Sequence, residues 1–120
     1  MGKKVLCIDD SPTIRKLVHK ALDPAGYDIV EAENGRQAIG LSDGGVDLFI
    51  VDVHMPEMDG FEFVEAIKKR SDVSGKPIVF LTTESSEEKK ERGKHLGVNG
   101  WIVKPFEPEA LAKVVAMLTG

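Results

Sequence analysis

The sequence predicts a single α/β domain built around a parallel sheet. Short apolar runs alternate five times with amphipathic segments along the 120 residues, which is typical of repeated βα units. The run Leu48–Val51 has no polar residue on either face, as expected of a central parallel strand covered by helices on both sides. A chain of this length can bury roughly two-thirds of the surface that it exposes when unfolded, so one core is expected across residues 1–120.

The first βα unit is marked by a clear helix start and a clear helix stop. A strand is expected over Lys4–Ile8. Ser11 can cap the next helix with its hydroxyl, and Pro12 suits the first helical position because its missing N–H is not needed there. Apolar residues then recur at helical spacing until Pro24 and Gly26, which end the helix.

The second and third units follow almost without a pause. A strand is expected over Asp28–Ala32, and Asn34 can cap the helix that follows it. Leu48–Val51 is the third strand, and after a loop containing Pro56 a helix follows in which Phe61 and nearby apolar residues share one face.

The fourth and fifth units differ in how strongly their helices can be held. The fourth strand is expected over Pro77–Leu81, and the charged helix after it has almost no apolar stripe before Leu96. A helix with so little to bury is held weakly to its sheet. The fifth strand is expected over Gly100–Val103, and the last helix has apolar residues at core spacing over Leu111–Leu118.

Composition excludes several classes of function. Hydrophobic residues make up 42% and charged residues 30%, the net charge is −4, and lysines alternate with glutamates instead of forming a basic tract. Direct nucleic-acid binding is therefore not expected, because phosphate backbones need clustered cations. No signal peptide or apolar stretch of membrane-spanning length is present, so a cytoplasmic monomer without a membrane partner is expected.

Cysteine and histidine do not suggest a metal centre. Cys7, the single cysteine, lies within the first apolar run and is expected to be a small buried hydrophobic residue. His19 and His95 are interpreted as surface residues of their helices, away from other ligand types.

Residues suited to phosphoryl chemistry end four of the five strands. Asp9 and Asp10 follow the first strand, Asp52 the third, Thr82 the fourth and Lys104 the fifth. Because the carboxyl ends of parallel strands meet at one edge, where open α/β sheets bind ligands, these side chains are expected to lie together. Each residue alone would be an ordinary loop residue, but their joint occurrence favours a functional site.

These residue types fit transfer of a phosphoryl group to an aspartate. An aspartate is ionised at neutral pH, so Asp52 needs no base to act as a nucleophile. Three carboxylates repel one another and an anionic donor, so the site requires a divalent cation, and oxygen ligands favour Mg²⁺. Lys104 adds a further positive charge, and the Thr82 hydroxyl can donate to a phosphoryl oxygen.

Four motifs carry a resemblance to a known family. They are DDS at 9–11, DVHMPEMDG at 52–60, LTTE around Thr82 and KPF at 104–106. With these motifs the whole chain resembles bacterial response-regulator receiver domains, and most closely the CheY-like, single-domain chemotaxis members. The resemblance implies a flavodoxin-like, doubly wound (βα)5 fold whose five parallel strands have the order 2-1-3-4-5.

The resemblance also implies a role for each site residue. Asp52 would accept a phosphoryl group from a histidine kinase. Mg²⁺ would be held by the carboxylates of Asp9, Asp10 and Asp52 together with the backbone carbonyl of His54. The protein would then be a phosphoacceptor that assists its own phosphorylation and dephosphorylation, and not a turnover enzyme.

The same resemblance implies a switch. Thr82 and Lys104 would bind the phosphoryl group and transmit its presence, and Trp101 would be the switch aromatic coupled to Thr82. The Lys104–Pro105 bond would be cis. The output face would be the fourth helix, the fifth strand and the fifth helix, and its partner a chemotaxis or motility protein such as a flagellar motor switch component.

Three residues near the site would tune its kinetics, according to the resemblance. His54 and Glu84 would set how quickly the aspartyl phosphate hydrolyses. Thr83 stands where the family commonly has a smaller residue, and would narrow the approach of the donor.

Three alternatives remain open from the sequence. An aspartate-nucleophile phosphatase also uses Mg²⁺, but it places an acid two residues beyond its nucleophile after strand one, where this chain has Ser11 and Pro12. A flavodoxin-like cofactor binder would need a phosphate-cradling loop where the acidic pair stands. The chain could also be the receiver portion of a larger regulator, although its start at Met1 and its end at the last helix favour a stand-alone protein.

Overall fold

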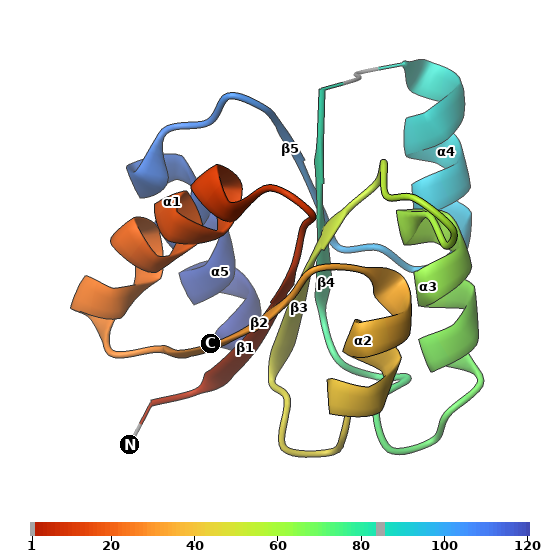
Figure 1. The fold of residues 1–120 in the computed structure, drawn as a ribbon, viewed down its shortest axis with the longest axis horizontal. Helices are drawn as coiled ribbons and strands as arrows, with labels where there is room; N and C mark the ends of the chain where they lie inside the picture. Colours follow the sequence, from red (N-terminus) through yellow and green to blue (C-terminus); the bar gives the residue numbers. More distant parts are fainter. Residues whose placement is uncertain (1, 84–85) are drawn as a thin grey trace.

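A computed structural model describes residues 2–83 and 86–120 (Figure 1). Among these residues, a five-stranded parallel sheet has the strand order β2-β1-β3-β4-β5, which confirms the expected doubly wound fold. The strands are β1 Lys4–Ile8, β2 Asp28–Ala32, β3 Leu48–Asp52, β4 Ile78–Thr82 and β5 Gly100–Val103.

Helices follow each strand in turn. They are α1 Pro12–Leu22, α2 Gly35–Leu41, α3 Gly60–Lys68, α4 Glu87–His95 and α5 Pro108–Thr119. None of the helices in the described part of the chain is long and apolar enough to cross a membrane.

Two strands end one residue later than the sequence predicts. Asp52 and Thr82 are the last residues of β3 and β4, whereas both were expected just beyond the strands. The reason is continued backbone pairing, since the N–H of Val53 donates to the carbonyl of Leu81 at 3.0 Å and the N–H of Lys104 donates to that of Thr82 at 2.7 Å. Both site residues are therefore fixed by the sheet and do not belong to loops.

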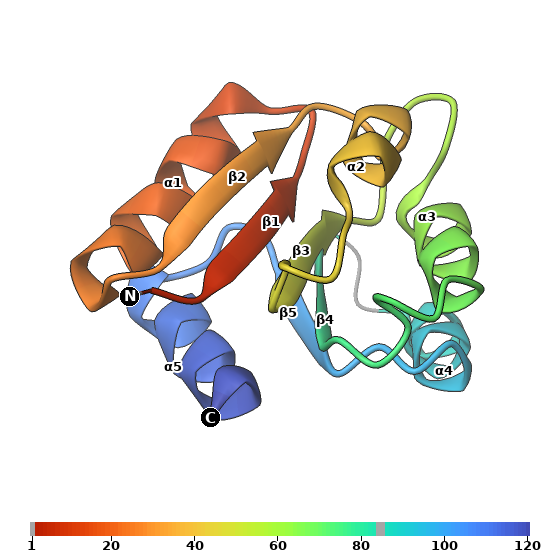
Figure 2. The same cartoon turned by 90° about the horizontal axis from the view of Figure 1, so that it is seen from below.

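The helices form two layers around the sheet. α1 and α5 cover one face, and α2, α3 and α4 cover the other (Figures 1 and 2). Neighbouring residues of one strand enter opposite layers of the core, as Leu6 packs in the α2–α3 layer and Cys7 in the α1–α5 layer. Cys7 is fully buried, as the sequence predicts.

The predicted caps hold the ends of the helices. The Ser11 hydroxyl accepts the N–H of Ile14 at 3.3 Å, and the Asn34 side chain accepts that of Gln37 at 2.8 Å. α1 ends in a short 3₁₀ turn that contains Pro24 and is closed by Gly26 with a φ of 88°, a conformation that favours glycine.

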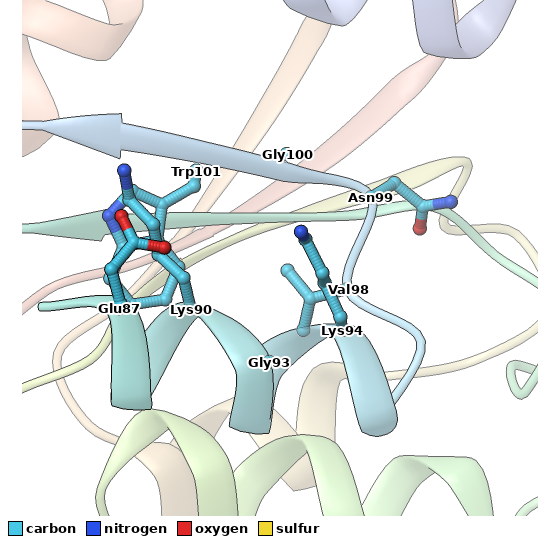
Figure 3. Close-up of a pocket in the computed structure, with 8 residues that line it drawn as sticks. All are labelled: Glu87, Lys90, Gly93, Lys94, Val98, Asn99, Gly100 and Trp101. Carbon is cyan, nitrogen blue, oxygen red and sulfur yellow. The ribbon is translucent and has the colours of Figure 1, made fainter. Parts of the chain in front are cut away.

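α4 is the least anchored helix, as its sequence predicts. Within α4, all of which is described, Gly93 is the one buried residue. A pocket of about 390 Å³ lies between this helix and β5, and Figure 3 shows Lys90 and Lys94 on the helix facing the strand that carries Trp101. The space beside the strand is therefore filled incompletely by α4.

Candidate functional site

Strand register brings the predicted site residues to one edge of the sheet. Ile8 of β1 pairs with Val51 of β3, so Asp9 and Asp52 lie beside each other at the ends of their strands. On the other side, Thr82 of β4 pairs with Val103 of β5, immediately before Lys104. The four residues come from four elements and share the carboxyl edge, where the sequence predicts a ligand site.

The ammonium group of Lys104 bridges two buried carboxylates. Its Nζ lies 2.8 Å from Asp9 Oδ2 and 3.2 Å from Asp52 Oδ1. Asp9 is fully buried, Asp52 is 3% exposed, and the Lys104 side chain is 14% exposed. Desolvated ion pairs of this kind interact more strongly than surface pairs, but their burial also carries a larger penalty.

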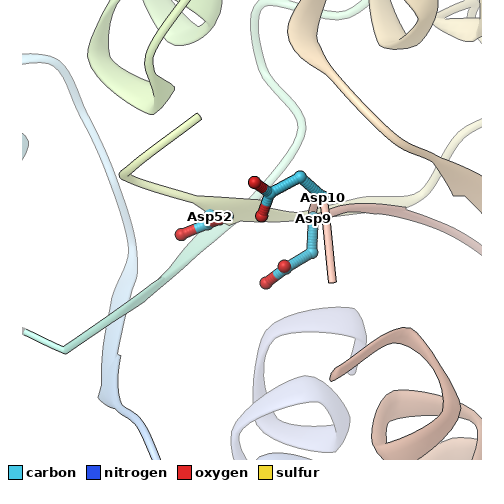
Figure 4. A group of neighbouring side chains, drawn as sticks. All are labelled: Asp9, Asp10 and Asp52. Atoms are coloured by element: carbon cyan, nitrogen blue, oxygen red, sulfur yellow. The ribbon is translucent and has the colours of Figure 1, made fainter. Parts of the chain in front are cut away.

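A third carboxylate completes an acidic cluster. One carboxylate oxygen from each of Asp9, Asp10 and Asp52 lies within 4.8 Å of the others. Figure 4 shows the three side chains gathered at the neighbouring ends of β1 and β3. Asp10 is exposed, so the cluster opens to solvent on its side.

Hydrogen bonds fix two of these carboxylates. Asp9 Oδ1 accepts the N–H of Ser11 at 2.9 Å, and Asp52 Oδ1 accepts the N–H of His54 at 3.1 Å. The other oxygen of Asp9, Oδ2, is buried and accepts no well-directed hydrogen bond from the described residues, although it is ion-paired with Lys104. Buried carboxylate oxygens are normally better satisfied, so this atom has capacity left for a ligand.

The charge of the cluster shifts the pKa values of Asp52 and Lys104. Burial, followed by the charge of Asp9, raises the pKa of Asp52 to about 6, although Lys104 and the His54 N–H favour its ionised form. Burial disfavours the charge of Lys104, but the close contact and charge of Asp9, followed by those of Asp52, outweigh it and raise the pKa of Lys104. The single positive charge of Lys104 does not balance the negative charges of three carboxylates.

The residues present fit a hard divalent cation. Mg²⁺ prefers oxygen ligands, few protein carboxylates and several waters, and the cluster offers carboxylate oxygens from three residues with one side open to solvent. The raised pKa of Asp52 indicates that the carboxylates outweigh the positive charge nearby. A thiolate or imidazole ligand set for a softer metal is not part of this cluster.

The predicted switch residues lie on neighbouring strands. Thr82 is fully buried at the end of β4. Trp101 is half-buried on β5, with its ring edge-on to Phe80 at 5.8 Å between centroids. The Lys104–Pro105 peptide bond is cis, as the resemblance implies.

Two of the three residues expected to tune the kinetics lie within the described residues. His54 and Thr83 are exposed at the edge that holds the cluster, and the backbone of His54 contacts Asp52. Glu84 lies outside the described residues.

Sequence reasoning missed a network beside the acidic cluster. The Arg15 guanidinium donates to the backbone carbonyl of Asp9 at 2.6 Å and to Glu31 at 2.7 Å. His19 lies partly exposed on α1, as expected of a surface helix residue, but the expectation that it lies away from other ligand types is wrong, since its ring lies 3.1 Å from carboxylates of both Asp23 and Glu31. The i, i+4 spacing of His19 and Asp23 was a visible signal, but the contacts with Glu31 depend on how α1 packs on β2.

Comparison with known proteins identifies the family. Residues 5–116 match the response regulator receiver domain family. The chain is 36% identical to chemotaxis protein CheY1 of Helicobacter pylori in an alignment that covers 98% of this chain and 97% of that protein. The structure of chemotaxis protein CheY4 of Vibrio cholerae superposes with a TM-score of 0.91 and 45% identity, covering 98% of this chain and 99% of that one.

Some relatives are longer. The phosphate regulon transcriptional regulatory protein PhoB of Pseudomonas aeruginosa is 36% identical over 98% of this chain, which spans 52% of that protein. The matches with CheY1 and with PhoB both cover 98% of this chain. This chain belongs to the response regulator receiver domain family of two-component systems and is similar to its chemotaxis members.

Proposed function

We propose that residues 1–120 form a receiver domain in which Asp52 accepts a phosphoryl group from the phosphohistidine of a histidine kinase. Receiver domains are signalling domains that interact with histidine kinases and bind Mg²⁺ in an acidic pocket. The observation that carries the proposal is the position of the Lys104 ammonium between Asp9 and Asp52, within a cluster of three carboxylates. This arrangement combines a nucleophile with groups that balance phosphoryl charge.

The transfer step needs no base. An Asp52 carboxylate oxygen forms a bond to phosphorus while the bond between phosphorus and the imidazole nitrogen of the donor breaks. The electron pair leaves with the imidazole, which takes a proton from solvent. Lys104 and the Thr82 hydroxyl are proposed to contact the equatorial oxygens of the phosphoryl group, where charge is spread in the transition state.

Asp9, Asp10, Asp52 and the carbonyl of His54 would hold the metal ion. Bound Mg²⁺ would supply neutralising charge for a phosphoryl oxygen. The exposed Asp10 leaves the entry side open, while the buried Asp9 and Asp52 exclude water from the opposite side.

The phosphoryl group is proposed to act as a switch through Thr82 and Trp101. Thr82 is linked to β5 by the hydrogen bond from the Lys104 N–H to its carbonyl, so movement at one strand end is transmitted to the other. α4 lies beside β5 across the pocket in Figure 3, and it is weakly anchored. The output face would therefore be α4, β5 and α5.

The proposed partners follow from the chemotaxis relatives. The donor would be a histidine kinase, and the output partner a chemotaxis or motility protein such as a flagellar motor switch component. A cytoplasmic monomer that binds neither nucleic acid nor membrane fits this role. His54, Thr83 and Glu84 are proposed to tune the lifetime of the aspartyl phosphate.

Mass spectrometry tests the phosphoacceptor directly. Incubation with Mg²⁺ and acetyl phosphate should add one phosphoryl group, and peptide mapping should place it on Asp52. Asp52→Asn should stay unmodified, whereas Asp28→Asn, which removes an exposed carboxylate from β2, should be modified like the native protein. Modification of Asp52→Asn to the native level would overturn the proposal, and steady hydrolysis of a small phosphate ester would favour the phosphatase alternative.

A further inference from the structure

Asp10 is the least constrained carboxylate of the acidic cluster. It is exposed, and no hydrogen bond joins its carboxylate to any residue within 2–83 or 86–120. Asp9 and Asp52 are buried and each accepts a backbone N–H, so their oxygens are fixed. No hydrogen bond from the described residues orients the Asp10 carboxylate, so the backbone that carries Asp10 is what sets the direction of its Cα–Cβ bond.

That backbone is held by Arg15. The carbonyl of Asp9 belongs to the peptide unit that joins Asp9 to Asp10, and the Arg15 guanidinium donates to it at 2.6 Å from the first turn of α1. On the other side, the N–H of Asp9 donates to the carbonyl of Ala32 at 3.1 Å. The Arg15 contact restrains the peptide between Asp9 and Asp10 directly, and the Ala32 contact restrains the preceding peptide, between Ile8 and Asp9.

Arg15 is itself fixed. Its Nε donates to Glu31 Oε1 at 2.7 Å, and its side chain is only 13% exposed. The other oxygen of Glu31 lies 3.1 Å from His19 Nε2, and the hydrogen bond from Arg15 is the main cause that lowers the pKa of Glu31. A planar guanidinium with two such contacts has little freedom, unlike an exposed arginine.

We propose that Arg15 is a positioning residue for the metal site, because it fixes the peptide between Asp9 and Asp10 so that the Asp10 carboxylate faces the ion. The inference rests on the proposed function, since it concerns the Mg²⁺ that the acidic cluster would bind. Groups outside the coordination shell that orient ligands typically change metal affinity by about 10-fold to 100-fold when removed.

The sign of the effect separates positioning from charge. Arg15 is a cation beside a cation site, so through charge alone it weakens metal binding, and a neutral replacement would strengthen it. Positioning has the opposite sign, because removing the guanidinium frees the peptide and weakens binding. The affinity for Mg²⁺ should fall more than the affinity for Ca²⁺, since Mg²⁺ demands near-ideal octahedral geometry whereas Ca²⁺ tolerates flexible ligands.

Titration calorimetry of the full chain with Mg²⁺ alone and Ca²⁺ alone tests the proposal. Arg15→Met should bind Mg²⁺ about 10-fold more weakly, and its affinity for Ca²⁺ should fall less. Its circular dichroism should show the native helix content. Arg15→Lys keeps the charge, but an ammonium group cannot replace the planar guanidinium that contacts both the Asp9 carbonyl and Glu31. This variant should therefore lose part of the Mg²⁺ affinity. The matched control is Lys16→Met, which removes an exposed cation from the same turn and should bind Mg²⁺ as well as the native chain or better.

The outcomes distinguish a failure of the Arg15 role from a failure of the proposed metal site. Native or tighter Mg²⁺ binding by Arg15→Met, or an equal loss for Mg²⁺ and Ca²⁺, would overturn the positioning role alone. If Arg15→Met does not fold, an undiminished Mg²⁺ affinity of Arg15→Lys overturns it. Absence of Mg²⁺ uptake by the native chain would refute the proposed function as well.

Discussion

Lys104 lies between two buried carboxylates, and its single charge faces three. The ion pair therefore does not stabilise the site fully, because Asp52 must lose most of its hydration while Asp9 remains nearby. The raised pKa of Asp52 expresses this cost. A cation bound here would reduce the repulsion between the carboxylates. The site is therefore suited to binding a metal ion before phosphoryl transfer.

Asp52→Asn should stabilise the metal-free protein at neutral pH. The folded state binds the Asp52 proton more tightly than the unfolded state, because its pKa rises from 3.8 to about 6 on folding. The unfolding free energy of the native chain should therefore fall as the pH rises from about 4 to about 6, and it should stay lower above this range. Urea unfolding with a chelator at pH 7.5 should find Asp52→Asn more stable by about 3 kcal/mol, since each pKa unit corresponds to about 1.4 kcal/mol.

The greater stability of Asp52→Asn over the native chain should be absent at low pH and after addition of Mg²⁺. At about pH 4 the native carboxyl is largely protonated, so the difference should nearly vanish. Saturating Mg²⁺ should stabilise the native chain and leave Asp52→Asn almost unchanged. A less stable Asp52→Asn in chelator at pH 7.5 would show that the carboxylate contributes stability to the apo state.

Gly60→Ala should damage the site through the backbone of the acceptor. An added Cβ would lie 2.7 Å from the carbonyl oxygen of Asp52 and 2.9 Å from the Cα of Val53, so the β3 end must shift. We expect a loss of about 1–3 kcal/mol in unfolding free energy and slower modification of Asp52 by acetyl phosphate.

A matched glycine provides the control. Gly40 lies in α2, where an added Cβ meets nothing within 4 Å, so Gly40→Ala should raise stability by up to about 1 kcal/mol. Its rate of Asp52 modification should be native. Equal rates for both alanine variants would show that the α3 start does not position Asp52.

α4 is held by a small set of contacts that are not a hydrophobic stripe. The guanidinium of Arg92 lies 4.2 Å from the centre of the Phe61 ring and 3.8 Å from a carboxylate oxygen of Glu65. The Phe61 ring is edge-on to Phe80, which in turn packs against Trp101. One exposed arginine on α4 thus connects α3 and the aromatic residues of two strands.

Two neighbouring substitutions should change α4 in opposite directions. In Gly93→Ala the new Cβ would make ordinary contacts with Trp101 at 3.6 Å and Phe80 at 3.7 Å, and helix propensity should add about 1 kcal/mol of local stability. Arg92→Met should lose about 0.5–1 kcal/mol of cation–π attraction. Hydrogen exchange of the α4 amides should slow in the first variant and quicken in the second.

An unchanged exchange rate in Arg92→Met would show that the arginine does not hold the helix. Exchange in α1, which buries Val18 and Leu22 and is remote from Arg92, is the internal reference and should be the same in all three proteins.

At the scale of the molecule, the sequence predicted the sheet, the helix starts and the acidic edge. These depend on local signals, such as apolar runs for β1 and β3, the Ser11 cap and charged residues at strand ends. It could not predict the Arg15 contacts or the bridging position of Lys104, because these depend on how α1 packs on β2 and on the distance between β1 and β5 across the sheet. Strand ends likewise depend on partner strands, which explains the shifts at Asp52 and Thr82.

Activation should be visible in Trp101, the only tryptophan of the sequence. Moving a two-state domain from about 1:99 to 99:1 requires about 5.5 kcal/mol of differential affinity, which a metal-bridged, lysine-paired phosphoryl group can provide. Mg²⁺ with beryllofluoride, a phosphoryl mimic, should therefore change Trp101 fluorescence. Asp52→Asn should abolish the change, and an unchanged native spectrum would contradict coupling through Trp101.

A crystal structure of the native chain grown with Mg²⁺ and beryllofluoride would locate both the cation and the modified carboxylate, and so would show whether Asp52 is the phosphoacceptor beside a metal site. We expect beryllofluoride bonded to a carboxylate oxygen of Asp52 and contacted by Lys104, with Mg²⁺ among the oxygens of Asp9, Asp10 and Asp52. Beryllofluoride on another residue, or Mg²⁺ bound away from this cluster, would contradict the proposed function.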